Sequence, residues 1–412
     1  MKYKFIKSLT LLSLFPTSNF ALSLDDLSIH GYGTVGIAYQ GNKDVLYRNS
    51  LSMDKGSQGD ISFANYSSFG LQLDLKASDK LSFVAQGVAS QKNSNAKLLD
   101  LVWINGKYNF TDDSSVRIGR MKLATFMYSD IIDVGYSYDW IRLPDMYSIM
   151  PINNYTGIEF SHNMKFDEFS LSSALHFGES QSHTCSNDPG NGEVLPSIIE
   201  VDKIYGGSLN FLSDNLSLRV GYGKVRLTLH NKTMDNALLG LNALGIPRIN
   251  ESIDKYQIKN APVEYLEVGG KYSFNDSYIV GEYMEMNTDT FLASNKSWYV
   301  GTGYNFEDWS PFILYSIIES TQNYKDIPIT NSSTAAAITY TNNVLSAISK
   351  SVTSVELQTT SLGLRYNLTE NSILKLQYDR QKEFKNHKLN FHFSDDNRVD
   401  LDVYSAAINF VF

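Results

Sequence analysis

The sequence has a single cysteine, Cys185, among its 412 residues. One cysteine excludes an intramolecular disulfide framework and a cysteine-based zinc site. We interpret Cys185 as an inert loop thiol, with an intermolecular disulfide as the alternative. The chain also lacks any stretch approaching the roughly 18 uninterrupted apolar residues that a membrane-spanning helix needs. A helical membrane protein is therefore excluded.

The motifs of common enzymes are absent as well. None of the seven histidines lies in a His-Glu-x-x-His frame; they are at positions 30, 162, 176, 183, 230, 387 and 392. His183 and Cys185 are close in sequence, but two ligands fall short of a metal site. No Gly-x-Ser-x-Gly motif occurs. We expect no catalytic residue, metal or cofactor, although a hydrolase that assembles serine and histidine from separate strands is an open alternative.

One glycine pattern resembles a nucleotide site. Gly31-Tyr-Gly33-Thr-Val-Gly36 has the dinucleotide-binding spacing, but that chemistry needs a helix N-terminus directly behind it. The residues that follow, 37–40, continue an alternating strand instead. We interpret these glycines as close backbone packing in a first strand.

The beginning of the chain has the features of a secretory signal. Three lysines flank a short apolar run at 9–15, and Ala21 and Ser23 offer cleavage points. We expect residues 1–23 to be removed and residues 24–412 to form one domain. Because the removed segment carries three lysines and no acidic residue, the net charge changes from −9 to −12. Such an acidic chain is not expected to bind nucleic acid.

The rest of the chain is rich in Tyr (26) and Phe (22) but has only four Trp, a supply suited to the aromatic girdles of a transmembrane β-barrel. Segments of about ten alternating residues recur, separated by short polar turns and longer polar stretches. The expected turns are 77–80, 111–114, 165–168, 213–215, 275–276, 307–308 and 369–371. The expected long loops are 41–60, 91–97, 121–154, 179–202, 230–262, 287–296, 321–353 and 381–399. The pattern predicts an all-β fold, a transmembrane antiparallel β-barrel of about 16 strands.

Charge identifies the inward face of these strands, because a lysine or arginine at the lipid midplane costs roughly 2–4 kcal/mol. In residues 216–222 the apolar side chains alternate with Arg219, which we therefore place in the lumen. The same alternation puts Arg365 and Lys375 inward. It is blurred at 98–103 and 224–229, where a β-bulge or a strand end would shift it.

The last strand has a distinctive ending. Tyr404, Ile408, Phe410 and the terminal Phe412 share one face. This alternation before a terminal Phe resembles the closing-strand signature of outer-membrane barrels, which implies recognition by the barrel-assembly machinery. An ordinary amphipathic strand that ends in Phe is the alternative.

Residues 116–152, together with 66–72 and 81–86, resemble the Gram-negative outer-membrane porin family. The matching residues are Gly119-Arg120, Ser129-Asp130, Val134-Gly135-Tyr136, Trp140, Arg142, Pro144 and Tyr147. Ala124, Asp139 and Leu143 replace prolines of the family pattern, and the Pro-Glu-Phe-Gly-Gly motif of enterobacterial porins is missing. The resemblance implies that the long third loop folds into the lumen.

The resemblance also implies a pore constriction. Acidic and basic residues of the loop would oppose wall cations and create a transverse field that sorts solutes by charge. The loop residues are Asp130, Asp133, Asp139, Arg142 and Asp145, and the wall residues are Arg120, Arg219, Arg365 and Lys375. A solvated surface loop with internal salt bridges is the alternative.

The expected function is passive diffusion of ions and small hydrophilic solutes, weakly favouring cations, across the Gram-negative outer membrane. The expected partners are outer-membrane lipid and two further copies in a homotrimer. One alternative is a surface interaction protein, an adhesin or receptor that binds through loops such as 230–262 and 321–353. Another is a selective channel for sugars or dicarboxylates.

Overall fold

The computed structural model describes residues 26–91, 98–187, 194–288, 293–321, 325–353, 356–384, 391–392 and 398–412. The predicted signal segment 1–23 lies outside these residues. The strands are β1 (Leu27–Gln40), β2 (Val45–Leu46), β3 (Ile61–Ser62), β4 (Ser68–Lys76), β5 (Leu81–Ser90), β6 (Leu99–Asn109), β7 (Ser114–Lys122), β8 (Asn154–Lys165), β9 (Phe169–Asn187), β10 (Val194–Ser213), β11 (Leu216–His230), β12 (Ala261–Phe274), β13 (Ser277–Asn287), β14 (Ser294–Tyr304), β15 (Trp309–Thr321), β16 (Leu357–Thr369), β17 (Ser372–Phe384), β18 (Phe391–His392) and β19 (Arg398–Val411).

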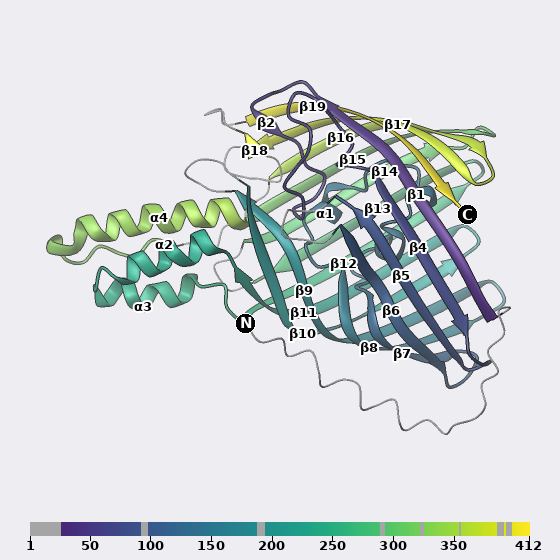
Figure 1. Cartoon of the computed structure of the whole chain (residues 1–412), viewed down its shortest axis with the longest axis horizontal. Helices are drawn as coiled ribbons and strands as arrows, with labels where there is room; N and C mark the ends of the chain where they lie inside the picture. Colours follow the sequence, from purple (N-terminus) through teal and green to yellow (C-terminus); the bar gives the residue numbers. More distant parts are fainter. Residues whose placement is uncertain are drawn as a thin grey trace.

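The long strands form one closed antiparallel barrel (Figure 1). Each pairs with its neighbour along the chain, and β19 pairs with β1 to close the sheet. Setting aside the two-residue pieces β2, β3 and β18, the described residues contain 16 strands, which confirms the predicted barrel. All seven predicted turns lie between consecutive strands at one end of the barrel. No helix in the described residues is long and apolar enough to span a membrane.

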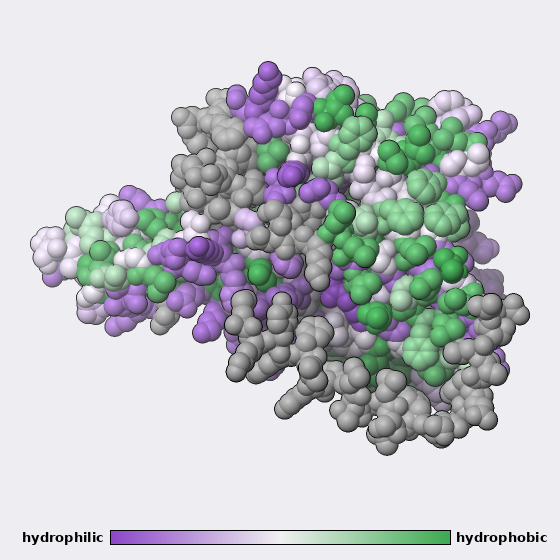
Figure 2. Space-filling model, in the orientation of Figure 1, coloured by the Kyte–Doolittle hydropathy of each residue, from purple (hydrophilic) through white to green (hydrophobic). Residues whose placement is uncertain are grey.

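Hydrophobic side chains gather on the outer face of the strands and hydrophilic ones on the rims, while the projecting helices carry both kinds (Figure 2). In β11, Leu218, Val220 and Tyr222 are exposed on the outside, whereas Arg219 is buried inside, as the alternation predicts. Aromatic rings border the apolar surface near the turns, where Trp309 and Tyr366 lie with their centroids 4.2 Å apart. Such borders are the aromatic girdles expected at the membrane interfaces.

Both regions of blurred alternation have a physical cause. The pairing of β5 with β6 shifts register between Gln86 and Gly87, opposite Val102. The facing of β11 does not change at 224–229, because the extra residue in its pairing with β10 is Asp202 of β10; Val225 and Leu229 face inward and pack in the apolar cluster that includes the helix residues. An extra residue in a strand reverses the facing of every later residue in that strand, which blurs the alternation at 98–103; at 224–229 apolar residues on the inward face hide an alternation that continues.

The segment 179–202 was expected to be a loop, and the structure corrects this. β9 continues to Asn187 and β10 begins at Val194, so the two strands extend as a paired hairpin up to Asn187 and Val194. Polar residues such as those at 180–184 can pair in a strand when it extends beyond the membrane, where both faces meet water or other loops. Polarity alone therefore does not mark the end of a strand here.

Two external loops fold into helices that project together from the loop end of the barrel (Figure 1). They are α2 (Lys232–Asn242), α3 (Pro247–Tyr256) and α4 (Ala335–Thr353). The Asn231 side chain accepts from the Met234 backbone and caps α2, and Pro247 occupies the first turn of α3. Apolar residues of the three helices, including Leu238, Ile253 and Leu345, pack into one cluster.

The glycine-rich first strand packs against the last one. A Cβ placed on Gly31 would lie 2.1 Å from Cζ of Phe412, and one on Gly33 would lie 2.4 Å from Cζ of Phe410. Two backbone hydrogen bonds of 2.9 Å also join Gly31 and Phe412. These glycines leave room for the terminal aromatic rings at the seam of the barrel, which confirms the close-packing interpretation.

Candidate functional site: a loop inside the barrel

The loop that joins β7 to β8, residues 123–153, lies inside the barrel; we call it the inner loop. It contains two 3-10 turns, η3 (Ser129–Ile131) and η4 (Gly135–Ser137), and the short helix α1 (Asp145–Ser148). The Tyr136 hydroxyl donates to the carbonyl of Glu370 at 2.6 Å. Because Glu370 belongs to the turn between β16 and β17, the inner loop reaches from the loop end of the barrel to the turn end.

Aromatic and apolar side chains fix the inner loop against one side of the barrel. Phe126, Trp140 and Tyr147 are buried together with inward residues of β13 to β15, among them Met284 and Tyr299. The ring centroids of Trp140 and Tyr299 are 6.0 Å apart in an edge-to-face arrangement. The inner loop therefore fills this side of the lumen with a packed core.

Gly135 of the inner loop rests on the seam where the barrel closes. The Asn409 amide of β19 donates to the Thr34 hydroxyl of β1 at 2.7 Å, across the seam. A Cβ on Gly135 would lie 2.3 Å from the Asn409 amide nitrogen and 3.0 Å from the Thr34 hydroxyl oxygen. Only glycine allows the backbone to approach this pair so closely, which gives a physical reason for the Val-Gly-Tyr motif.

The acidic residues of the inner loop are mostly bound to partners. Asp139 accepts from the Arg365 guanidinium at 3.3 Å and from the Tyr278 hydroxyl at 2.6 Å. Asp133 pairs with Lys122 at the end of β7. These contacts join the loop to the wall, so the charges are neutralised in pairs and do not face each other across an open gap.

A second ionic group lies deeper. Arg142 pairs with Asp145 and lies 3.9 Å from Asp379 of β17. Asp145 is fully buried and also accepts from the Ser316 hydroxyl of β15 at 2.6 Å. Buried charges are tolerated when paired and hydrogen-bonded in this way. Arg142 and Asp145 thus serve to seat α1 on the wall.

Lys375 is 1% exposed and holds the middle of the inner loop. Its ammonium donates to the carbonyls of Gly135, Tyr138 and Trp140, the last at 2.7 Å. It also lies 4.7 Å from the centroid of the Tyr138 ring. A lysine has three donors and no acceptor, so these three carbonyls use its full capacity.

Two further wall residues hold the inner loop, and the sequence did not single out the first of them, Glu282. Glu282 accepts from the Met127 backbone at 2.9 Å and from the hydroxyls of Tyr147 and Tyr299. Arg219, which the sequence did place inward, donates to the Ala124 carbonyl and lies 3.2 Å from Glu267. No sequence pattern links Glu282 to the inner loop, since its partners there, Met127 and Tyr147, are 155 and 135 residues away along the chain.

Asp130 differs from the other loop carboxylates because it is exposed in the lumen. Arg117, Lys122 and Glu159, on β7 and β8, lie within electrostatic range of it. Arg117 and Glu159 form an ion pair on the wall. The passage left beside the inner loop is thus bordered by one loop carboxylate and a wall that carries both signs of charge.

Arg120 does not occupy the lumen-wall position expected for it. It is in register with Ile104 of β6 and Thr156 of β8, two exposed residues of the outward-facing rows. Its guanidinium turns to the Leu101 carbonyl at 2.6 Å and lies 3.6 Å from Asp100. The inward position belongs to Arg117, which alternates with the outward residues 116 and 118; the family motif drew attention to the neighbouring Gly-Arg instead.

The turn end of the lumen has a recess of about 280 Å³. Its charged lining residues carry both signs: Asp26, Asp74, Lys76, Lys107 and Arg117. Trp103 and Asn105 of β6 complete the polar wall. In the part of the chain that the structure describes, no three His, Cys, Asp or Glu side chains are grouped as metal ligands would be.

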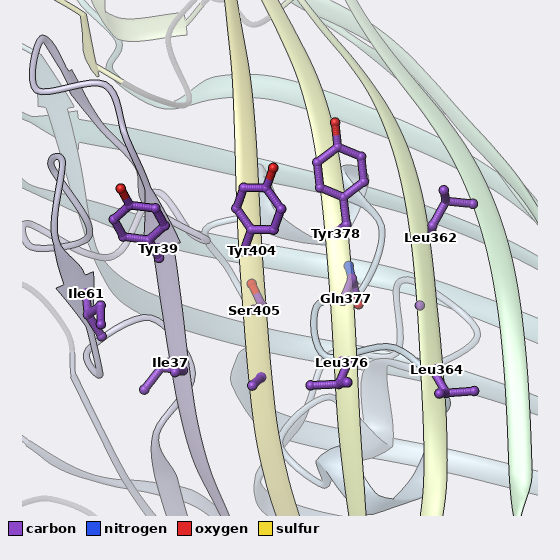
Figure 3. Close-up of a pocket in the computed structure, with 12 residues that line it drawn as sticks. Ile37, Tyr39, Ile61, Leu362, Leu364, Leu376, Gln377, Tyr378, Tyr404 and Ser405 are labelled. Atoms are coloured by element: carbon purple, nitrogen blue, oxygen red, sulfur yellow. The ribbon is translucent and has the colours of Figure 1, made fainter.

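A second hollow of about 550 Å³ lies on the outer face, over β1, β16, β17 and β19 (Figure 3). Tyr39, Tyr404 and Tyr378 form a row across three neighbouring strands, with Leu376 and Leu364 below them (Figure 3). Tyr404, Ile408 and Phe412 are exposed on this outer face, as the alternation of the last strand predicts. The hollow is an apolar groove on the membrane-facing surface.

The closed barrel, its apolar outer face and the polar passage beside an inner loop define an outer-membrane β-barrel channel protein. A family model described as Gram-negative porin matches residues 8–386. The chain therefore belongs to the Gram-negative porins and is a protein of the Gram-negative outer membrane.

Solved porin structures share this fold at low sequence identity. An anion-selective porin from Comamonas acidovorans matches with a TM-score of 0.53 and 12% identity, over 94% of this chain and 99% of that chain. The outer membrane channel DcaP of Acinetobacter baumannii matches with 0.53 and 10%, over 95% and 99%. The trimer form of OmpT from Vibrio cholerae matches with 0.51 and 11%, over 94% and 99%. No curated protein sequence matches significantly.

Proposed function

We propose that the chain forms a water-filled channel through which ions and small hydrophilic solutes diffuse passively, without catalysis, cofactor or coupling to energy. The observation that carries this proposal is the placement of the inner loop. It packs against β13–β17 and the seam, while exposed Asp130 faces the polar wall of β7 and β8. An apolar core on one side and charged groups on the other are what a hydrated passage requires.

Planar-bilayer recording tests this proposal. The purified protein should give stepwise conductance that rises in proportion to potassium chloride concentration. A selective channel would instead show block that saturates as a sugar or dicarboxylate is added, and the recess that carries both signs of charge is where such a solute would bind. Absence of conductance from protein whose circular dichroism shows an intact β-sheet would reject the channel.

We propose a weak preference for cations. The mature chain is expected to carry −12, and Asp130 is the exposed carboxylate of the inner loop. Arg117 and Lys122 lie close enough to offset part of its field, so the selectivity should be modest. Screening limits the reach of a fixed charge to about 10 Å at 0.1 M salt, so the preference should weaken as salt rises.

We propose a homotrimer, with the outer groove within the subunit interface. The groove is apolar and continuous over β1, β16, β17 and β19, and a porin of similar fold, OmpT, has a trimer form. The mass of the unheated protein in mild detergent tests this, and a monomer-sized particle would refute it.

We also propose that residues 1–23 are cleaved on export and that the barrel-assembly machinery recognises the last strand. Amino-terminal sequencing of the mature protein should begin at Leu24. Deleting Phe412 should reduce insertion into the outer membrane, because its ring and backbone contact Gly31 at the closing seam. Normal insertion of the truncated chain would contradict the second proposal.

A surface interaction role is a second candidate, because the projecting helices expose large apolar side chains. Leu239 is 66%, Tyr340 60% and Leu244 45% exposed, and exposed apolar groups often mark binding surfaces. A variant with Leu239 and Tyr340 changed to Ser should lose attachment of cells to surfaces while its conductance stays unchanged. Unchanged attachment would remove this candidate.

A further inference from the structure

The loop that joins β1 to β4 extends across the external mouth of the barrel. The Cys185 backbone, near the tip of β9, donates to the Leu51 carbonyl at 2.7 Å. The Thr184 hydroxyl donates to the same carbonyl at 3.2 Å. Five strands separate β1 from β9 in the order of the barrel, so this loop leaves its own strands and contacts a distant part of the wall.

Leu51 also connects the mouth to the inner loop. Its backbone donates to the Ser148 carbonyl of α1 at 3.3 Å. Its side chain packs, beside Ile149, against buried Ile318 of β15 and Leu357 of β16. Leu51 therefore contacts the inner loop and two separate parts of the barrel wall, the tip of β9 and the neighbouring strands β15 and β16.

The segment around Leu51 is held in shape by its own hydrogen bonds. The Gln40 side chain is fully buried and donates to the carbonyls of Val45 at 2.8 Å and Ser57 at 3.0 Å. Arg48, also fully buried, donates to the Met53 carbonyl at 3.0 Å. Backbone hydrogen bonds join Tyr47 to Ser57 in both directions. Residues 47–57 are thus a closed, cross-linked structure rather than a loose connection; we call them the mouth strap.

We propose that the mouth strap is the entrance restriction of this channel, and that Leu51 is the positioning residue that holds it across the lumen. The proposal rests on the channel function proposed above. It places a size limit on solutes at the external mouth, before they reach Asp130 and the wall beside the inner loop. Solutes that fit beside the inner loop would still be excluded while Leu51 keeps its contacts.

The natural cysteine reports the position of the strap. Cys185 is 4% exposed, and its backbone bond to Leu51 places it at the contact. A membrane-impermeant maleimide should therefore label it slowly in wild-type protein. Leu51→Gly removes the side chain that packs at Ile318 and Leu357 and loosens the backbone. Labelling should accelerate about tenfold, since loss of one half-buried leucine contact shifts such an equilibrium by that order.

A liposome-swelling assay with sugars of increasing size measures the entrance limit. Leu51→Gly should admit sugars that wild-type protein excludes and should raise conductance. Lys55→Ala, an exposed position in the same strap, is the matched control and should change neither labelling nor the size limit. Cys185→Ser should abolish labelling and so confirm its site.

The outcomes separate this inference from the channel proposal. If wild-type protein conducts but Leu51→Gly has the same size limit, conductance and labelling rate, the entrance restriction is refuted and the channel stands. If wild-type protein does not conduct, the channel proposal fails. Faster labelling without a change in the size limit would show that the strap moves but does not restrict passage, which also overturns the inference.

Discussion

Lys375→Met tests whether the inner loop is held as the structure indicates. The substitution keeps a long side chain but removes the ammonium, which leaves the carbonyls of Gly135, Tyr138 and Trp140 without their donor. Each hydrogen bond to a charged group contributes about 1.5–3 kcal/mol, but burying the ammonium opposes this. A buried acceptor left without its donor costs about 1–3 kcal/mol, and three carbonyls lose theirs here, so after this opposing effect we expect a net cost of about 3–5 kcal/mol.

That free energy changes the equilibrium between attached and detached loop. At about 1.4 kcal/mol for each factor of ten, the attached state loses roughly two to nearly four orders of magnitude in relative population. Single-channel recordings of Lys375→Met should show larger current fluctuations and additional conductance levels, because the middle of the loop leaves the wall transiently. When samples are heated to increasing temperatures before electrophoresis, the folded form should also be lost at a lower temperature than in wild-type protein.

The control is Lys382→Met, on the same strand but at a half-exposed outward position. It removes the same charge without contact to the inner loop and should leave the recordings unchanged. Lys375→Arg keeps a positively charged donor and should show smaller current fluctuations than Lys375→Met. Equal current noise and heat stability in Lys375→Met and wild-type protein would refute the reasoning, because three carbonyls cannot lose their buried donor without consequence.

Three other changes probe the site and the barrel. Asp130→Asn should reduce the cation-selective reversal potential in a potassium chloride gradient. Asp145→Asn, at a fully buried position, should leave the reversal potential unchanged and lower heat stability. An unchanged reversal potential in Asp130→Asn would show that another charge sets the ion selectivity. Gly31→Ala should lower folding stability by about 1–3 kcal/mol through overpacking against Phe412, while Gly87→Ala, whose nearest neighbour would be 3.4 Å away, should be tolerated in urea-dependent refolding. Ala406→Arg in the outer groove should lower assembly, since an arginine facing lipid costs roughly 2–4 kcal/mol; native-gel mass and yield equal to wild type would place the groove outside both lipid and interface.

The barrel could be predicted because its signals are local. A turn rich in Asn and Asp, such as Thr111–Ser114, depends on residues next to each other in the chain. The side of the sheet on which a side chain lies alternates with every residue along a strand. This alternation correctly placed Arg219, Arg365 and Lys375 inward. The energetic penalty for charge in lipid makes this period easy to read.

The inner site could be predicted only in part, because its geometry depends on distant segments. The sequence suggested opposed charges, but not that Arg365 would bind Asp139 directly, 226 residues away. It named Arg120 from a motif where alternation favours Arg117. The motif also named the neighbouring Gly119, but its φ of 135° could not be predicted from the sequence. Glu282 and Leu51 act through partners in distant loops and strands, which no periodicity reveals.

The seat of Gly135 has a consequence for the order of assembly. That seat is made by Thr34 of the first strand and Asn409 of the last, residues 375 apart in the chain. It exists only after the sheet has closed, and contacts across such a separation form late because the intervening chain must first be ordered. The inner loop can therefore dock completely only in a finished barrel. In a barrel whose seam is still open, the inner loop cannot narrow the passage. Complete docking of the inner loop therefore occurs only in barrels that have closed.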